Sequence, residues 1–540
     1  MADVTISDLP SVSPTGSSLL PVSVGGITGK ATISTLPVSY NSLTNIPPAI
    51  IIPANTNTLI ASSEGNLPNG LPQEAGGYYM NMFISRDRRH LLFSGLGDAS
   101  GCGYNYNYQP HMAKIAPVGA YIPTLSAYKW ETVYVGYRFF VAMTTEKRIF
   151  TGGYSVYGNG VAPAQLPGGW TRFSTEFSFN GSALVTYGGA AAGTTIKSMY
   201  CSFTNQGNYP SVFIIGSDNR LYGFGNTGYG VMMDTSGAER WRVGYLNITN
   251  VSNIKCQGST SMALLTDGTV RTAGYSGHYQ MGDGTANGYN YTWHQPLRAS
   301  DSQPLGSTAN GGSPVRQIEV CGGWTDASMY AVTNANQLYA WGYNGYYQLG
   351  DGTTTAVQYP KLVASNVGKV YVGGGNYHSA LYTTPDRRYL FAAGYSGYGQ
   401  LNIGAPWYQY NWTQILDANN YGGSKIKKVI VTGTGSYSTT FVLLDNSRIL
   451  SCGYMPGSLA NLYNDYTELG VHVDWIETNP AINYDEESIE DIGANGISNE
   501  ATVFALTTKG RLHMMGYSTQ YKMGWGTGGY NWCPFWIEIH

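Results

Sequence analysis

The chain has 540 residues, a net charge of −3 and only 11% charged residues, against about 25% in typical soluble domains. It has no basic run long enough to form a phosphate-binding stripe, so nucleic-acid binding is not expected. No window approaches about 18 uninterrupted apolar residues, and the start lacks a basic region followed by an apolar stretch. We therefore expect neither membrane insertion nor a signal peptide.

Residues 1–48 differ in composition from the rest of the chain. They are rich in Ser, Thr, Pro and Val and carry few charges. A segment of this size buries too little surface to be stable alone, because below roughly 40 residues a chain usually needs partners or staples. Its alternating apolar runs favour association with copies of itself, and the alternative is a disordered leader.

This segment is similar to the start of tailed-phage fibre and virion appendage proteins. The matching strings are residues 6–10 (ISDLP), 19–33 (LLPVSVGGITGKATI) and 40–48 (YNSLTNIPP). The resemblance implies a segment that assembles, commonly as three copies, and docks on the virion. The candidate attachment residues are Ile6, Leu9, Leu20, Val22, Val24 and Ile33. Residues 49–77, which contain several prolines and a Gly/Asn-rich stretch, are predicted to be a neck or linker.

From residue 78 onward, a glycine-rich string recurs at intervals of about 60 residues, and self-similarity at such a period is the signature of a repeat architecture. We call this string the glycine motif. Weaker copies begin near Gly95, Gly153, Gly225 and Gly453. The clear copies are residues 274–285 (GYSGHYQMGDGT), 342–353 (GYNGYYQLGDGT), 394–401 (GYSGYGQL) and 516–527 (GYSTQYKMGWGT).

Each clear copy follows three short runs rich in β-branched and aromatic residues. In the fifth unit these are residues 315–323, 327–332 and 337–342, and turn residues separate the last two as in a β-hairpin. A fourth run, often led by proline, follows the motif. Four short strands per repeat predict an all-β protein, with a β-propeller of seven or eight four-stranded blades over residues 78–540. We expect the last run, residues 534–539 (PFWIEI), to pair with the first unit and close the ring.

The repeat resembles the regulator of chromosome condensation family. Residues 339–352 (YAWGYNGYYQLGDG) match the core of that family's pattern, and residues 378–381 (HSAL) match its H-S-x-A-L element. The resemblance implies a propeller, most often of seven blades. It does not imply one function, because such propellers include a nucleotide exchange factor and many unrelated binding proteins.

The sequence contains no recognisable catalytic or metal-binding motif. H-E-x-x-H, G-x-S-x-G and Walker-type strings are absent, and the six cysteines, which include no C-x-x-C pair, are expected to be buried hydrophobes. We expect no metal and no cofactor. The acidic residues 485–491 (DEESIED) offer a carboxylate pair for glycan cleavage, and the alternative is a solvated loop.

Tyrosine and tryptophan recur in the connecting segments of three units. Both present a flat apolar face with a polar tip and are enriched at recognition surfaces, although repeated aromatic residues also pack between blades. The tyrosines within the motif, Tyr275, Tyr343, Tyr395 and Tyr517, are expected in the core or between blades. The candidate receptor-binding residues are Tyr289, Tyr291, Trp293, Trp407, Tyr408, Tyr410, Trp412, Tyr530 and Trp532.

These observations favour a phage virion protein that is not an enzyme: a tail fibre or spike that binds a host-surface receptor, expected to be a glycan or a protein. The expected partners are two further copies in a homotrimer and tail, baseplate or capsid proteins. The expected location is the virion, after synthesis in the host cytoplasm. The alternatives are a capsid-mounted fibre or decoration protein, a polysaccharide depolymerase and an exchange factor for a small GTPase.

Overall fold

The computed structural model is built from β-strands, with two 3-10 turns, η7 (Ala309–Gly311) and η9 (Ala418–Asn420), among the residues that it describes. The chain divides into two compact units, Met1–Ile51 and Ile52–His540. The described residues are 19–24, 27–32, 59–61, 80–85, 88–89, 91–96, 108–114, 128–135, 139–153, 171–177, 189–203, 210–225, 232, 240–323, 325–373, 378–403, 407–432, 438–454, 471–480, 482–495, 502–517 and 532–539.

The first unit contains one hairpin, in which β1 (Leu19–Val24) pairs antiparallel with β2 (Ile27–Thr32). Three of the predicted attachment residues, Leu20, Val22 and Val24, lie on β1. The other three, Ile6, Leu9 and Ile33, lie outside the described residues.

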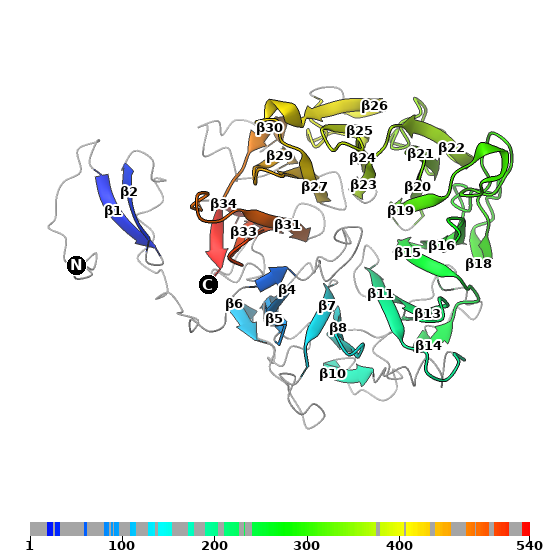
Figure 1. Ribbon diagram of the computed structural model, residues 1–540, viewed down its shortest axis with the longest axis horizontal. Coiled ribbons are helices and arrows are strands. Elements are labelled where there is room, and N and C mark those ends of the chain that lie inside the picture. Colours follow the sequence, from blue (N-terminus) through cyan, green and yellow to red (C-terminus); the bar gives the residue numbers. More distant parts are fainter. Residues whose placement is uncertain are drawn as a thin grey trace. The chain divides into compact units, whose positions relative to one another are not determined.

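The second unit contains eight antiparallel four-stranded sheets in its described part, each made of strands consecutive in the chain. Figure 1 shows them in chain order around a ring, and we number them blades 1 to 8. The strands of blades 1 to 4 are β3 (Leu59–Ala61), β4 (Met80–Ser85), β5 (Leu91–Leu96), β6 (Tyr108–Lys114), β7 (Trp130–Val135), β8 (Phe139–Thr144), β9 (Ile149–Gly153), β10 (Thr171–Phe177), β11 (Ile196–Phe203), β12 (Pro210–Gly216), β13 (Leu221–Gly225), β14 (Arg240–Tyr245), β15 (Val251–Gln257), β16 (Thr260–Leu265), β17 (Val270–Tyr275) and β18 (Tyr289–His294).

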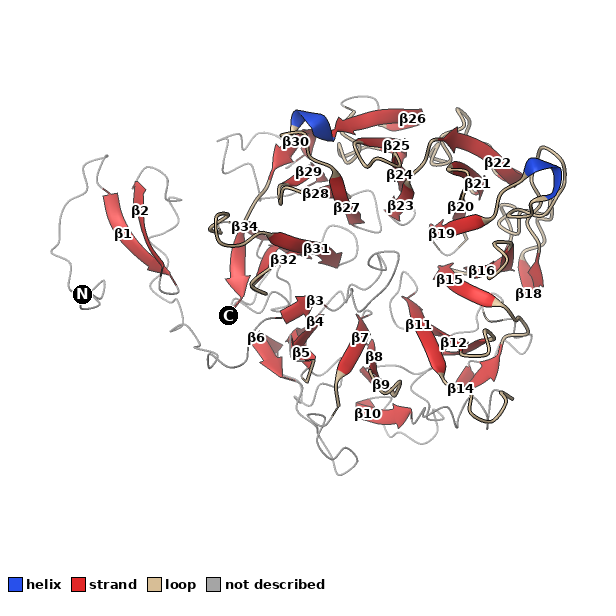
Figure 2. Cartoon of the chain, in the orientation of Figure 1, coloured by secondary structure: helices blue, strands red, loops and turns tan. Residues whose placement is uncertain are grey.

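Blades 5 to 8 repeat the same order, with the first strand nearest the centre of the ring (Figure 2). The predicted all-β propeller is confirmed, and the described strands form eight blades. The remaining strands are β19 (Val315–Cys321), β20 (Ser328–Thr333), β21 (Gln337–Gly342), β22 (Val357–Ser365), β23 (Lys369–Gly373), β24 (Ser379–Thr383), β25 (Tyr389–Tyr395), β26 (Tyr408–Asp417), β27 (Ile426–Thr432), β28 (Thr439–Leu444), β29 (Ile449–Tyr454), β30 (Val471–Glu477), β31 (Ile489–Asn495), β32 (Thr502–Thr507), β33 (Leu512–Tyr517) and β34 (Trp532–Ile539).

The hydrophobic core lies between adjacent blades. Every residue of the second strands β20, β28 and β32 is buried, whereas the fourth strands β22 and β26 are largely exposed. Both faces of a second strand are covered by neighbouring blades, which explains their continuous apolar runs. One such cluster joins Met262 of blade 4 to Met329 and Trp341 of blade 5.

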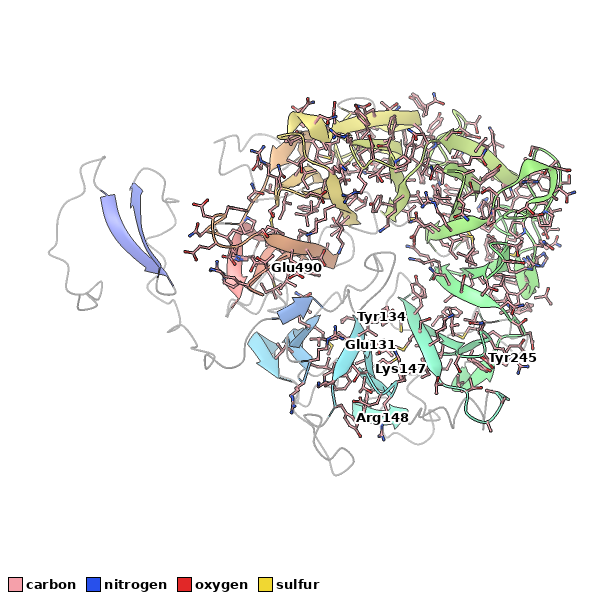
Figure 3. All side chains as sticks on the ribbon, in the orientation of Figure 1. Glu131, Tyr134, Lys147, Arg148, Tyr245 and Glu490 are labelled. Atoms are coloured by element: carbon pink, nitrogen blue, oxygen red, sulfur yellow. The ribbon has the colours of Figure 1, made fainter. Side chains whose placement is uncertain are left out.

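The first strands of adjacent blades are joined by polar contacts at one register position. Tyr134 on β7 donates from its hydroxyl to the carbonyl of Met199 on β11 at 2.8 Å (Figure 3), and Tyr200 makes the same contact with Cys256 at 3.1 Å. At the equivalent place in blade 4, Lys255 pairs with Glu319 of blade 5 at 3.1 Å. These contacts join the first strands of four consecutive blades, 2 to 5, through polar side chains.

The ring does not close as the sequence predicted. β34 pairs with β33 as the fourth strand of blade 8, and β3 pairs with β4 as the first strand of blade 1. Both blades are complete, so neither has a place for a strand from the other. Blades 1 and 8 meet instead through side chains, including an edge-to-face contact between Phe83 and Phe504 with ring centroids 5.5 Å apart.

The buried thiols Cys201, Cys256, Cys321 and Cys452 match the expectation of core cysteines. From the sequence, Cys201, Cys256 and Cys321 are also expected at equivalent places in successive blades, and this expectation is wrong for Cys321. Cys201 and Cys256 occupy the same register, but Val320 takes that place in blade 5, and Cys321 lies one residue later. Because strand side chains alternate, Cys321 packs against blade 6 instead of blade 4.

Across the described ranges, no helix is long and apolar enough to cross a membrane. The predicted domain limits at residues 48 and 77 stay a prediction. Strand β3 lies inside the segment 49–77, which was predicted to be a neck or linker.

Candidate interaction surface

Strand direction gives the two sides of the ring different chemistry. Because neighbouring strands are antiparallel, all connections from third to fourth strands emerge on one side, which we call the motif side. These segments hold a single Lys or Arg in the sequence, Lys522; they are residues 97–107, 154–170, 226–239, 276–288, 343–356, 396–407, 455–470 and 518–531. The turns between second and third strands lie on the other side and carry cations in residues 86–90, 145–148, 217–220, 384–388, 445–448 and 508–511.

The first glycine of each motif lets two backbone segments approach closely. Gly274, Gly342 and Gly394 have φ angles of 106°, 92° and 111°. A Cβ on Gly274 would lie 2.2 Å from the carbonyl oxygen of Ser259, which is far inside contact distance. Any other residue would therefore force the motif away from the blade.

A buried glutamine holds each of the three motifs in blades 4, 5 and 6. In blade 5, Oε1 of Gln348 accepts from the backbone N–H of Tyr346 at 2.8 Å. The equivalent bonds are His278 N–H to Gln280 and Tyr398 N–H to Gln400. These residues are fully buried, so they serve the fold and leave the exposed parts of the motif to contact solvent.

The motif of one blade binds the outer strand of the next. The backbone N–H of Gly284 donates to the carbonyl of Gln358 at 3.3 Å, and that of Gly352 donates to Tyr410 at 3.0 Å. Both acceptors lie where the register of the outer strand shifts and its carbonyls leave their own sheet. The register shift in the outer strand of one blade therefore frees a carbonyl group, which accepts a hydrogen bond from the motif of the preceding blade.

A carboxylate fixes the second half of the motif in blades 4 and 5. Asp351 accepts from the backbone N–H and hydroxyl of Thr353 and pairs with Lys361 at 2.9 Å. Burial raises the pKa of Asp351, but the bonds from Lys361 and Thr353 outweigh burial, so the pKa lies below its ordinary value. In blade 4, Asp283 pairs with His294 at 2.6 Å, and its pKa is lowered in the same way by Thr285 and His294 against burial.

Two of the predicted binding residues, Trp293 and Trp412, pack between blades, and so does Trp475, which was not among them. Trp293 donates from Nε1 to the carbonyl of Leu246 in blade 3 at 2.7 Å, and Trp475 of blade 7 donates to Ile415 of blade 6 at 2.7 Å. Trp412 occupies the same register, and its indole lies beside Gly350 of blade 5. Their indoles are partly buried with the hydrophobic clusters, so these tryptophans join blades.

Other predicted residues meet motif tyrosines in one cluster on the motif side. Ring contacts of 4.5 to 6.4 Å between centroids join six tyrosines from blades 5 and 6. The rings of His278 from blade 4 and His378 from blade 6 contact one end of the cluster. We call this the tyrosine cluster; it consists of Tyr343, Tyr346, Tyr347, Tyr395, Tyr408 and Tyr410.

Exposure increases toward one end of this cluster. Tyr395 is buried, whereas Tyr410 is 42% exposed and the adjoining Trp407 is 65% exposed. In blade 4, Tyr289 is 50% exposed and packs on Tyr275, and Tyr291 is half-buried. Tyr530 lies outside the described residues, and only the backbone of Trp532, on β34, is described. A role in binding for these residues stays a prediction.

One residue of the cluster has a strained backbone. Tyr347 has a φ of 62°, in the left-handed region, and the equivalent residue of blade 6 is Gly399 with a φ of 75°. A bulky residue is an outlier in this conformation, and its strain costs on the order of 1–3 kcal/mol. Its ring contacts Tyr410 at 4.5 Å and Tyr408 at 5.8 Å, so the strained residue contributes to the exposed end of the cluster.

A Ser–His pair and the acidic residues predicted as a carboxylate pair form hydrogen bonds and ion pairs within the fold. Ser328 lies 2.6 Å from Nε2 of His378, but its hydroxyl donates to the carbonyl of Tyr343, and both side chains are fully buried. Such a pair has no access to a substrate. The predicted carboxylate pair is likewise engaged: Glu486 pairs with Lys509, Glu487 with Arg511 and Asp491 with Lys428.

Sequence reasoning missed Tyr346 and Tyr347 as members of a surface cluster and assigned Tyr343 and Tyr395 to the core or the blade interfaces. A signal was present, because a tyrosine stands at position 347 where the next repeat has Gly399. No group of three or more potential metal ligands occurs within the described ranges.

Comparison with known protein families identifies one repeat directly. Residues 336–382 match the family model of the Regulator of chromosome condensation (RCC1) repeat. The chain carries an RCC1 repeat. The matched residues run from β21 to β24 and include the motif of blade 5, so the resemblance seen in the sequence and the propeller fold are both supported.

Relatives with named functions match only part of the chain. The human E3 ubiquitin-protein ligase HERC2 is 30% identical over 143 residues, which are 26% of this chain and 3% of that protein. The bovine Secretion-regulating guanine nucleotide exchange factor is 32% identical over 148 residues, 27% of this chain and 28% of that protein. Among solved structures, Prp20p from Saccharomyces cerevisiae, described with its binding to Gsp1p and histones, has a TM-score of 0.48 and 15% identity over 78% of this chain and 92% of that chain.

These relatives correct the interpretation of the chain as a phage protein. They are mammalian proteins named as a ligase and an exchange factor. The finding contradicts the tail fibre or spike, its capsid-mounted and depolymerase alternatives, the homotrimer with virion partners, the host-surface glycan or protein receptor and the virion location. The resemblance of residues 1–48 misled because it rests on short strings in under a tenth of the chain, whereas the new alignments span about a quarter of it.

Proposed function

We propose that this chain is a protein-binding β-propeller that acts through its surface. The observation that supports this most is the tyrosine cluster, which exposes aromatic rings on a rigid ring of blades. Tyrosine and tryptophan are enriched at protein interfaces and at their hot spots. The acidic and Ser–His groups that could act as catalysts are paired or buried in the fold, which agrees with a binding role.

A crosslinking experiment tests this role. A photoactivatable amino acid placed at position 354, an exposed position directly after the blade 5 motif, should crosslink a discrete protein partner. The same group at position 427, an exposed residue of β27, serves as the matched control. The full chain should yield a partner at position 354 alone. Failure to recover any protein specifically at the motif side would contradict a binding role for that side.

A more specific candidate is guanine nucleotide exchange on a small GTPase. The bovine relative named as an exchange factor supports it, although this chain spans 28% of that protein. An exchange factor needs no catalytic residue for bond making, because it acts by binding its partner more tightly without nucleotide than with it. A rigid propeller with one binding side is suited to that task.

Nucleotide release measures this activity directly. A panel of purified small GTPases would be loaded with a fluorescent guanine nucleotide and mixed with the full chain. We expect faster release from at least one member, and tighter binding to the nucleotide-free form of that member. If no member releases nucleotide faster than its intrinsic rate, exchange activity is excluded for that panel, and the broader binding role is then judged by the crosslinking result.

A further inference from the structure

We propose that the tyrosine cluster binds an arginine-bearing segment of a partner protein. The inference rests on the proposed binding role and specifies its ligand. It starts from the shape of the site: two blades contribute contacting rings, the exposed end contains Tyr410, and Trp407, three residues earlier in the chain, is also exposed. Aromatic faces fixed by their neighbours lose little conformational freedom when a ligand stacks on them.

The connections that carry the cluster supply no cation that would compete for its aromatic faces. The two connections that carry it, residues 343–356 and 396–407, contain no Lys or Arg, and their single acidic residue is Asp351. Lys361 is the cation that approaches, and it is engaged with Asp351 at 2.9 Å. The face of a tyrosine ring is negative and attracts a cation within about 6 Å of its centroid. The exposed rings therefore offer a site that the adjoining connections of this chain supply with no cation.

The flat faces of the individual tyrosine rings favour arginine over lysine as the ligand. A guanidinium is planar, remains charged at every physiological pH and stacks on aromatic faces, whereas an ammonium is a compact and more strongly hydrated charge. The ring of Tyr347 meets that of Tyr410 edge to face, at 74° between planes, so two differently oriented faces are available. A segment carrying several arginines could stack on these faces and reach Trp407.

The strain at Tyr347 supports a binding role for this ring. The equivalent residue is Gly399 in blade 6 and Tyr279, with a φ of 64°, in blade 4, so the turn accepts glycine and does not require tyrosine, although a strained tyrosine also occurs once outside the cluster. Retaining a bulky residue in the left-handed region adds an aromatic face at the exposed end of the cluster. Strain of this kind concentrates at binding sites, where the surrounding structure holds it in place.

Titration calorimetry with the full chain tests the proposal. The probe is a blocked peptide of alternating glycine and arginine, and its matched controls replace arginine by citrulline, which keeps the shape without the charge, or by lysine. We expect the citrulline peptide to bind at least about tenfold more weakly than the arginine peptide, with the lysine peptide between them. Equal binding of the arginine and citrulline peptides, or tighter binding of a proline-rich peptide, would overturn the proposal.

Three variants locate the binding. The double variant W407L/Y410L should lose at least about tenfold in affinity for the arginine peptide. Y484L, which removes a 44%-exposed tyrosine outside the cluster, should bind like the wild type. Y347G should keep a thermal midpoint close to that of the wild type, because relief of strain offsets lost ring contacts, while its affinity falls measurably. Unchanged affinity in W407L/Y410L or in Y347G would contradict the assigned site.

The two proposals fail in different ways. If a partner is crosslinked at position 354 but the arginine peptide binds no better than its citrulline form, the binding role stands and the arginine ligand is wrong. If the arginine peptide binds the cluster but no protein is crosslinked on the motif side, the chemistry of the cluster stands and its role as a protein-binding surface is wrong.

Discussion

Trp412 and Trp475 both pack between two blades, but only one of their indole N–H groups has a hydrogen-bond acceptor. Both occupy the same register of an outer strand. The indole Nε1 of Trp475 donates to Ile415, whereas Nε1 of Trp412 is buried and has no hydrogen-bond partner among the described residues. A buried donor that lacks a partner costs free energy, and removing it together with some ring area can be nearly neutral.

Phenylalanine substitutions should separate these two cases. W475F should lower the free energy of unfolding by about 0.5–1.5 kcal/mol, because the carbonyl of Ile415 loses one of its two donors and keeps only Nδ2 of Asn402. W412F should change it by less than about 1 kcal/mol, since lost ring contact is offset by removal of an unpaired donor. Urea unfolding of both variants checks the prediction. A larger loss for W412F than for W475F would show that packing outweighs the hydrogen bond.

Residue-scale chemistry was only partly predictable from the sequence. The repeated glycines pointed correctly to close approach and turns, because glycine is tolerated where a Cβ would clash. Whether a repeated tryptophan joins blades or faces solvent depends on strand register, and a one-residue difference reverses it. Trp293 and Trp407 were therefore predicted alike, although the structure places one between blades and leaves the other 65% exposed.

At the scale of elements, the motif of one blade stabilises the outer strand of the next. Asp351 is central to this arrangement because it binds Thr353, Asn344 and Lys361 at once, and only 3% of its side chain is exposed. Lys361 is 47% exposed, and ion pairs at such surfaces contribute on the order of 0–1 kcal/mol. Most of the stabilisation should therefore come from the neutral donors.

Two substitutions test whether the neutral donors or the ion pair with Lys361 contribute more to the stability of the motif. D351A should lower the free energy of unfolding by about 1–2 kcal/mol, because the N–H and hydroxyl of Thr353 lose their acceptor, while Asn344 keeps its bond to the carbonyl of Thr353. K361M should lower it by less than about 1 kcal/mol, since the apolar stem of the lysine is kept and only the exposed charge is lost. Chemical denaturation at neutral pH measures both. Equal losses in the two variants would mean that the ion pair, and not the neutral bonds, stabilises the motif.

The same carboxylates predict an acid sensitivity. The pKa values of Asp283 and Asp351 in the folded chain lie below their ordinary value, so the folded state holds these protons more weakly than the unfolded state does. Their stabilisation is fully present above about pH 4 and is lost as the pH falls through the folded-state pKa values. Unfolding free energies measured from pH 6 to pH 2.5 should decline, and D351N should decline less than the wild type. If the unfolding free energy of D351N fell with pH as steeply as that of the wild type, Asp351 would not contribute to the acid sensitivity.

At the scale of the whole molecule, the four-stranded repeat and its order could be read from the sequence, but the number of blades, seven or eight, and the way in which the ring closes could not. Repeat spacing and four runs per repeat predicted the propeller. Closure was predicted wrongly, because the first strand of blade 1 has only three residues, Leu59–Ala61, in a segment with no clear copy of the repeat. Without that strand, the final run of the chain seemed to have no sheet of its own.

Two truncations test the boundary between the units. Removal of residues 1–51 should leave the thermal midpoint of the propeller unchanged, since this unit is compact in itself. A chain beginning at residue 78 loses β3 and leaves β4 without its inner neighbour, so its midpoint should fall by several degrees. Calorimetry of both products measures the difference. Equal midpoints would favour the predicted boundary at residue 78 and assign β3 no role in stability.

The first and last blades share no strand, and no backbone hydrogen bond joins them among the residues that the structure describes. Phe83 and Phe504 meet between these blades, and a pulling force applied to the two termini would separate these rings before it broke any sheet. Stretching a single molecule should therefore begin with a small, reversible extension as blades 1 and 8 separate. Larger extensions should follow as individual blades unfold.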